Sequence, residues 1–282
     1  MFFRIPLIPI ARERRTTWLA AAVLSLLVAA PAAAQTGLPF TSDFEVGDFS
    51  EWDAFRNTTG AVIMNTGCHS GRCLRTPLVE GTNSDTYGDF YFGDHSTRRG
   101  TKVEEVWLRL WSKFDPGLTF PTGQKIAILN LTDGVSTERR YQVILYVRGN
   151  GEYALQTSDI ANWDFFNHWQ NQGTATRVRL GQWDKLKVHV RLNTPGSSNG
   201  VLRMWVNDEL KLSYNNINIR FNTAYGMNKL ILSTYATPPS PTDGMQWHDS
   251  ITLALTDPDG SSPPPPPSSA PTAPRNVRIV SQ

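Results

Sequence analysis

Residues 105–115 read EVWLRLWSKFD and place two kinds of side chain at alternating positions. Successive side chains of a β-strand point to opposite faces, so one face of this segment would be apolar. The other face would carry two indoles and two cations. Aromatic rings stack on the apolar faces of sugars, and cations neutralise carboxylate or sulfate groups. We therefore predict a substrate-binding surface for an acidic polysaccharide that includes Trp107, Arg109, Trp111 and Lys113.

Three further segments oppose an apolar face to a face of polar and aromatic side chains. Residues 140–148, RYQVILYVR, place Gln142, Tyr146 and Arg148 on one face together with Ile144. The segments DKLKVHVRL and VLRMWVN alternate in the same way. Two interpretations remain open. Such faces either bind a sugar polymer or simply cover a sheet, with cations packed over indoles.

The elements that position these faces are β-strands. Apolar runs are separated by clusters of Gly, Asn, Asp or Pro, and no segment has a sustained helical period, apart from a turn or two near 160–170. The composition, with 9 Trp, 8 Tyr and 13 Phe, is typical of a β-protein. We predict an all-β, two-sheet antiparallel sandwich of jelly-roll type. Its strands are expected at 59–64, 72–79, 87–92, 104–114, 125–131, 140–148, 152–157, 185–193, 201–206, 210–214, 229–235 and 247–255.

The ends of the chain differ from its middle. Residues 1–34 combine four arginines, an apolar run and small residues before Gln35, which predicts a cleaved signal peptide. The sandwich is expected at 35–257, followed by a Pro/Ser-rich linker at 258–274. Residues 275–282 resemble the first strand of a fibronectin type III module. The protein is thus predicted to be secreted or periplasmic.

Cys68 and Cys73 enclose the four residues HSGR. An exported protein meets an oxidising compartment, and a loop of this length can close as a disulfide. The alternative is a metal site that includes His69, but two Cys and one His leave a zinc site one ligand short. We predict the disulfide.

The chain resembles the concanavalin A-like jelly-roll polysaccharide lyases, the relatives of alginate, glucuronan and heparin I lyases. The resemblance runs from about residue 44 to residue 255. It is carried by LRLWSKFDPGLTFPTGQKIAILNL, RYQVILYVRGNGEYALQ, GQWDKLKVHVRLNTPG, GVLRMWVNDELKLSYNNINIR and MQWHDSITLAL.

This resemblance implies β-elimination on a uronic acid. The reaction needs a cation or amide for the C6 carboxylate, a base for the C5 proton and an acid for the leaving oxygen. Lys125 opens a strand within a G-x-K segment, as in the relatives. The resemblance implies Lys125 and Gln142 as carboxylate neutralisers and Tyr146 as the candidate base, because nearby cations can lower the pKa of a tyrosine from about 10. Arg148 is a further substrate-binding candidate.

Two positions differ from the relatives. Ile144 stands where an arginine is expected, and Tyr153-Ala154-Leu155 replaces a pair of tyrosines. The alternatives to a lyase are therefore a non-catalytic, lectin-like carbohydrate-binding module and a surface adhesion module.

A structural calcium ion is the one cofactor that we expect, and no organic cofactor is expected. Glu45 and Asp249 are expected in the first and last strands, which pair in many jelly rolls, and sugar-binding relatives of this shape hold calcium there. The alternative is two unrelated surface acids, and Asp43 and Asp48 could substitute for Glu45.

The expected partner is an acidic polysaccharide. The net charge of only +2 does not indicate nucleic-acid binding. We expect a monomer with no membrane span once the signal peptide is removed.

Overall fold

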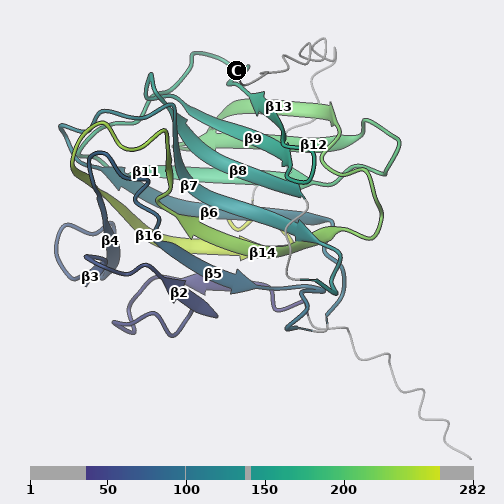
Figure 1. Ribbon diagram of the computed structural model, residues 1–282, viewed down its shortest axis with the longest axis horizontal. Helices are drawn as coiled ribbons and strands as arrows, with labels where there is room; N and C mark the ends of the chain where they lie inside the picture. The colour runs from purple at the N-terminus through teal and green to yellow at the C-terminus, as the bar shows by residue number, and fades with distance from the viewer. Residues whose placement is uncertain (1–35, 99, 137–140, 261–282) are drawn as a thin grey trace, which may run out of the picture. The chain divides into compact units, whose positions relative to one another are not determined.

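The computed structural model describes residues 36–98, 100–136 and 141–260. The predicted signal peptide, most of the predicted linker and the predicted fibronectin-like tail lie outside the described residues. The described residues form sixteen β-strands and no helix, and the strands build two antiparallel sheets (Figure 1). The predicted jelly-roll sandwich is confirmed.

Sheet A has eight strands in the order β13-β12-β11-β6-β16-β4-β3, with β1 paired to β16. The pairing of β1 with β16 confirms that the first and last strands are neighbours. The strands are β1 (Phe40–Ser42), β3 (Val62–Met64), β4 (Cys73–Leu78), β6 (Glu105–Phe114), β11 (Asp184–Arg191), β12 (Gly200–Val206), β13 (Glu209–Ile217) and β16 (Gly244–Ala254).

Sheet B also has eight strands, in the order β10-β9-β8-β7-β14-β5-β2, with β15 paired to β7. The strands are β2 (Ala54–Arg56), β5 (Tyr87–Tyr91), β7 (Gly123–Thr132), β8 (Tyr141–Arg148), β9 (Tyr153–Asp159), β10 (Asp164–His168), β14 (Gly226–Ser233) and β15 (Ala236–Thr237).

The core lies between the two sheets and takes alternate residues from each strand. Val106, Leu108 and Leu110 of β6 are buried there, and Val143 and Leu145 of β8 belong to the same cluster. The predicted division of each strand into an inner and an outer face is therefore confirmed for β6 and β8. The outer faces carry the polar and aromatic residues.

Every predicted strand overlaps an observed one, but β1, β2, β10 and β15 were not expected. The suggestion of a helical turn near 160–170 is wrong, because residues 164–168 form β10, the edge strand of sheet B. In the segment WDFFNHW aromatic residues occur at positions of both parities, so the alternation typical of a half-buried strand is not visible.

Candidate functional site

The predicted site residues lie on two opposite faces of the sandwich. Lys125, Gln142, Tyr146 and Arg148 belong to sheet B, whereas the predicted substrate-binding residues of β6 belong to sheet A. The core separates the two outer faces, so these two sets cannot line one groove. Strand alternation tells which residues point outward, but it does not tell which sheet a strand joins.

The sheet B face has a small apolar centre formed by Ile128, Ile144, Tyr146, Ala154 and Ile231, separate from the main core. We call these five residues the outer cluster. Ile128 of β7 and Ile231 of β14 are cross-strand partners, and so are Ile128 and Ile144 of β8. Of the candidate catalytic residues, Tyr146 belongs to this cluster, and Gln142 lies on the same outer face of β8.

Lys125 lies directly across from Tyr146 in the pairing of β7 with β8. A register shift follows between Lys125 and Ala127, and it places both Ile126 and Ala127 in the core. Such a bulge re-aims side chains locally. The Lys125 backbone N–H donates to the Tyr235 carbonyl at 2.9 Å, and the ammonium lies 4.3 Å from the centre of the Tyr235 ring. The Lys125 ammonium thus lies against the Tyr235 ring, and the strand register places the backbone of Lys125 opposite that of Tyr146.

Tyr146 is held by an amide. Its hydroxyl donates to Asn167 Oδ1 at 3.0 Å, and Gln156 Nε2 donates to the same oxygen at 2.7 Å. Burial raises the pKa of Tyr146 well above its usual value, and the nearby Arg148 opposes this shift only in part. The phenol therefore stays protonated near neutral pH. This direction is opposite to the lowered pKa that a tyrosine base would use at neutral pH.

The other two sheet B candidates are engaged by neighbouring side chains. Gln142 is buried and its Nε2 donates to Asn130 Oδ1 at 2.8 Å. Arg148 pairs with Glu152 at 2.7 Å, and its guanidinium lies 4.0 Å from the centre of the Trp169 ring. Both residues lie on the same outer face as Tyr146, as predicted.

A second polar cluster on sheet B was not predicted. Asp89 of β5 is buried and pairs with Arg56 at 2.7 Å and with Lys229 at 2.9 Å. Beside it, Tyr91 stacks on His95 with 4.0 Å between the ring centres. The alternation of Tyr, Asp and Tyr in the segment TYGDFY was the sequence signal for an outward-facing strand here.

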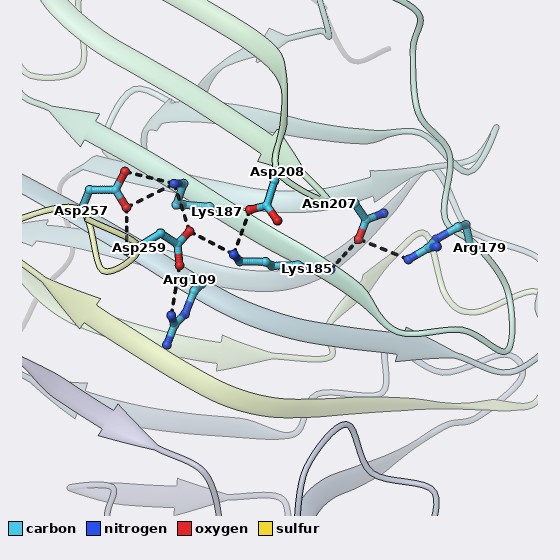
Figure 2. Close-up of polar contacts among 8 residues, drawn as sticks. All are labelled: Arg109, Arg179, Lys185, Lys187, Asn207, Asp208, Asp257 and Asp259. Carbon is cyan, nitrogen blue, oxygen red and sulfur yellow. Dashed lines mark hydrogen bonds and ion pairs between the residues drawn. The ribbon is translucent and has the colours of Figure 1, made fainter. Parts of the chain in front are cut away.

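Three cations of the sheet A face, Arg109, Lys185 and Lys187, are paired with the chain's own carboxylates (Figure 2). Lys187 pairs with Asp257 at 3.0 Å and with Asp259 at 3.1 Å. Asp259 also pairs with Arg109 and with Lys185, each at 3.1 Å. We call residues 256–260 the aspartate strap, because they lie across β6 and β11. The predicted linker would have begun at residue 258, within this strap.

The rings of the sheet A face are also packed. Trp107 stacks on His189 at 4.0 Å between ring centres, and Trp111 stacks on His69 at 3.7 Å. The Lys113 ammonium lies 4.9 Å and 4.6 Å from the centres of the Trp183 and Trp247 rings. These contacts favour the second interpretation of this face, in which rings and cations cover the sheet.

The two predicted calcium ligands meet at one loop. Glu45 Oε1 accepts a hydrogen bond from the Arg72 backbone N–H at 2.6 Å, and Asp249 Oδ2 accepts one from the Ser70 N–H at 2.9 Å. Both amides lie between Cys68 and Cys73, whose predicted disulfide is present. Burial raises the pKa of Asp249, and the Ser70 N–H opposes this.

A calcium ion at this loop would need oxygen ligands beyond these two carboxylates. Among residues 36–260 as described, no group of three or more His, Cys, Asp or Glu side chains could hold a metal. Backbone carbonyls would have to complete the set, and calcium accepts such ligands. Calcium at this loop stays a prediction.

Comparison with known families supports the predicted resemblance. Residues 143–237 match the family model of polysaccharide lyase 14. This range includes Tyr146 and Arg148 but neither Lys125 nor Gln142. The resemblance to polysaccharide lyases is confirmed. No curated protein sequence matches the chain significantly.

Solved structures establish the fold. The marine PL-14 alginate lyase from Aplysia kurodai is similar with a TM-score of 0.57 and 14% identity, over 79% of this chain and 100% of that one. The endo-beta-1,4-glucuronan lyase from the fungus Trichoderma reesei gives 0.56 and 13%, over 77% and 95%. Cellulose induced protein, Cip1, gives 0.52 and 14%, over 77% and 97%.

Proposed function

We propose that the protein is a polysaccharide lyase that cleaves a uronic-acid polymer on the outer face of sheet B. The observation that carries the proposal is the register of β7 and β8, which places Lys125 directly across from Tyr146. The Tyr146 hydroxyl is held by a hydrogen bond to the Asn167 amide. A cation and a phenol at opposed positions of neighbouring strands would supply two of the groups that β-elimination requires. The family match over residues 143–237 supports the same reaction class.

In the proposed reaction, Lys125 neutralises the C6 carboxylate and thereby acidifies the C5 proton. The Tyr146 phenolate takes that proton, the C4–C5 double bond forms and the C4–O bond breaks. The resulting phenol returns the proton to the leaving oxygen. One tyrosine can thus act as base and then as acid, and the reaction is balanced without any other reactant.

The test is to incubate the protein separately with alginate, polyglucuronate and heparin and to follow the ultraviolet absorbance of an unsaturated uronide. Tyr146→Phe and Lys125→Ala should each lower the rate at least about 100-fold, a typical effect of losing a positioned acid–base group or a group that stabilises developing charge. Tyr225→Phe is the matched control, because this ring packs edge-on against Tyr141 away from the proposed site. The proposal fails if no polymer yields the product.

A non-catalytic carbohydrate-binding module is the second candidate. The observation that favours it is the raised pKa of Tyr146, together with Ile144 at a position where the relatives are expected to carry arginine. Binding to the same polymers without product, unchanged by Tyr146→Phe, would favour this candidate.

Export and calcium are parts of the same proposal. We infer secretion or periplasmic localisation from residues 1–34, and the Cys68–Cys73 disulfide is compatible with an oxidising compartment. We infer a structural calcium ion from the two carboxylates at the disulfide loop. Among the described residues, no helix has the length and hydropathy of a membrane span.

A further inference from the structure

The hairpin of β9 and β10 exposes an unusual set of side chains. Four aromatic residues are among the large apolar side chains that the described chain leaves in solvent, and three of them lie within residues 163–169. Trp163 is 74% exposed, Phe165 37% and Trp169 39%. We call these three residues the aromatic edge. Large aromatic groups left in water at one place indicate a binding surface.

The aromatic edge lies on the same outer face as the proposed catalytic pair. Phe165 and Asn167 of β10 are opposite Ser158 and Gln156 of β9. Asn167 accepts the hydrogen bond of the Tyr146 hydroxyl, so its side chain lies on the outer face of sheet B. Phe165, two residues before it in the same strand, points to the same face. His168, of the other parity, is buried against Thr157 and Tyr214. The exposed rings therefore continue the sheet B face to its edge.

The arrangement of the rings suits a sugar polymer. Rings at 163, 165 and 169 flank the Asn167 amide, so apolar surfaces are interrupted by a hydrogen-bonding group. The Arg148 guanidinium stacks on Trp169 and brings a cation to this edge. Fully extended, residues 163–169 span at most about 20 Å, which exceeds the width of a single sugar ring.

The hairpin holds Trp163 outward at some conformational cost. Trp163 has a φ of 53°, a left-handed conformation that bulky residues rarely adopt. Asp159 supports the turn, because its carboxylate accepts hydrogen bonds from the Ala161 N–H at 3.1 Å and from Asn162 Nδ2 at 2.7 Å. The left-handed residue closes the β9–β10 turn, and its indole is left exposed there.

We propose that Trp163, Phe165 and Trp169 form a stacking platform that binds sugar rings of the polysaccharide at the β10 edge of sheet B. This inference rests on the proposed function, since it supplies binding positions beyond the bond that is cleaved. Stacking acts on the sugar ring and not on its charge. The platform therefore increases the affinity for longer chains and does not select the acidic group.

The test measures binding of alginate and polyglucuronate to the Tyr146→Phe protein, which keeps the polymers intact. Adding Trp163→Ala or Phe165→Ala should raise the Kd about tenfold each, as expected for loss of one aromatic contact. The melting temperature should not change, because both side chains are exposed. Phe221→Ala is the matched control, because Phe221 is 58% exposed and lies outside the aromatic edge. The Kd of this variant for the polymers should stay unchanged.

Chain length gives a second readout. Trp163→Ala should weaken binding of long oligosaccharides and leave the shortest ones unaffected, and raised salt should not reproduce this pattern. An unchanged Kd for every polymer would overturn the platform.

Product release and KM, measured on protein that keeps Tyr146, separate the platform from catalysis. If the wild-type protein releases no unsaturated product but Trp163→Ala still weakens binding, the lyase proposal fails and the platform stands. If product forms and Trp163→Ala leaves KM for long chains unchanged, the platform fails alone. A wild-type protein that binds neither polymer overturns the platform.

Discussion

Tyr146 determines how the proposed lyase responds to pH. Burial raises its pKa, so the phenolate that the reaction needs is scarce near neutral pH. As long as the pH is below the pKa, the fraction of phenolate rises about tenfold for each unit by which the pH increases. We expect kcat/KM to rise steadily from neutral to alkaline pH, up to the limit of folding. A pH–rate profile that is flat over this range would exclude Tyr146 as the base.

Arg109 shows how contacts change a prediction made from side-chain type. In sequence it is a candidate for binding a sugar carboxylate, but Asp259 and Thr252 engage its guanidinium at 3.1 and 2.9 Å. We expect Arg109→Ala to leave polysaccharide binding unchanged and to lower the free energy of unfolding by about 1–3 kcal/mol, because Asp259 loses a charged partner. Binding and urea denaturation measured on the same preparation check this.

Weakened binding of anionic polymers alone, with unchanged stability, would contradict that expectation and restore sheet A as a binding face. Lys185→Ala provides a comparison, since Lys185 touches Asp259 and the exposed Asp208. A shared loss of binding would identify a cationic surface.

At the scale of elements, the aspartate strap joins the end of the sandwich to β6 and β11. Lys187 and Asp257 are almost fully buried as a pair. Removing the only partner of a buried charge costs about 3–5 kcal/mol, but Lys187 would keep Asp259 as a partner after Asp257 is replaced. We therefore expect Asp257→Asn to destabilise the domain by about 1–3 kcal/mol, the cost of losing one hydrogen bond to a charged group, as measured by urea denaturation. Asp208→Asn is the control, because Asp208 is exposed and surface pairs contribute about 0–1 kcal/mol.

The strap also makes stability depend on acid. Hydrogen bonds from Lys187, Lys185 and Arg109 outweigh the desolvation of Asp259 and lower its pKa to about 2. A carboxylate with a depressed pKa in the folded state stabilises the fold above its unfolded pKa and loses this effect as pH falls. The difference in the free energy of unfolding between wild type and Asp259→Asn should thus be largest above about pH 4 and be lost as the pH falls through about 2. A difference that does not vary across this window would contradict the assignment.

Strand alternation predicted most of the elements and little of their arrangement. The inner and outer faces of β6, β8, β11 and β12 follow from the period of two, which any sandwich strand must obey. Which sheet receives β6 depends on pairing with β11 and β16, which are far away in sequence. The two sets of candidates therefore looked like one site in sequence and lie on opposite faces in space.

Long-range contacts explain the other differences. Asp257 and Asp259 follow the last strand and precede a Pro-rich segment, so nothing local indicates that they pair with Lys187. The aromatic edge was missed because WDFFNHW lacks simple alternation. The Cys68–Cys73 disulfide was predictable because both partners lie within one short loop.

At the scale of the whole molecule, the disulfide loop ties the ends of the sandwich together. Glu45 follows β1, Asp249 belongs to β16, and both bind amides of this loop. If calcium also binds there, it stabilises the folded state by mass action. A chelator should then lower the melting temperature, added calcium should restore it, and Asp249→Ala should abolish the response. A melting temperature that does not change with the chelator would show that calcium does not stabilise the fold.

The most direct test of the whole account is product formation by paired variants. Wild-type protein should release unsaturated uronide from at least one of alginate, polyglucuronate and heparin, faster at alkaline than at neutral pH. Tyr146→Phe should release none while it still binds that polymer, and Tyr225→Phe should match the wild type. Equal product from wild type and Tyr146→Phe, or product from none of the polymers, would contradict the assignment of a lyase site to sheet B.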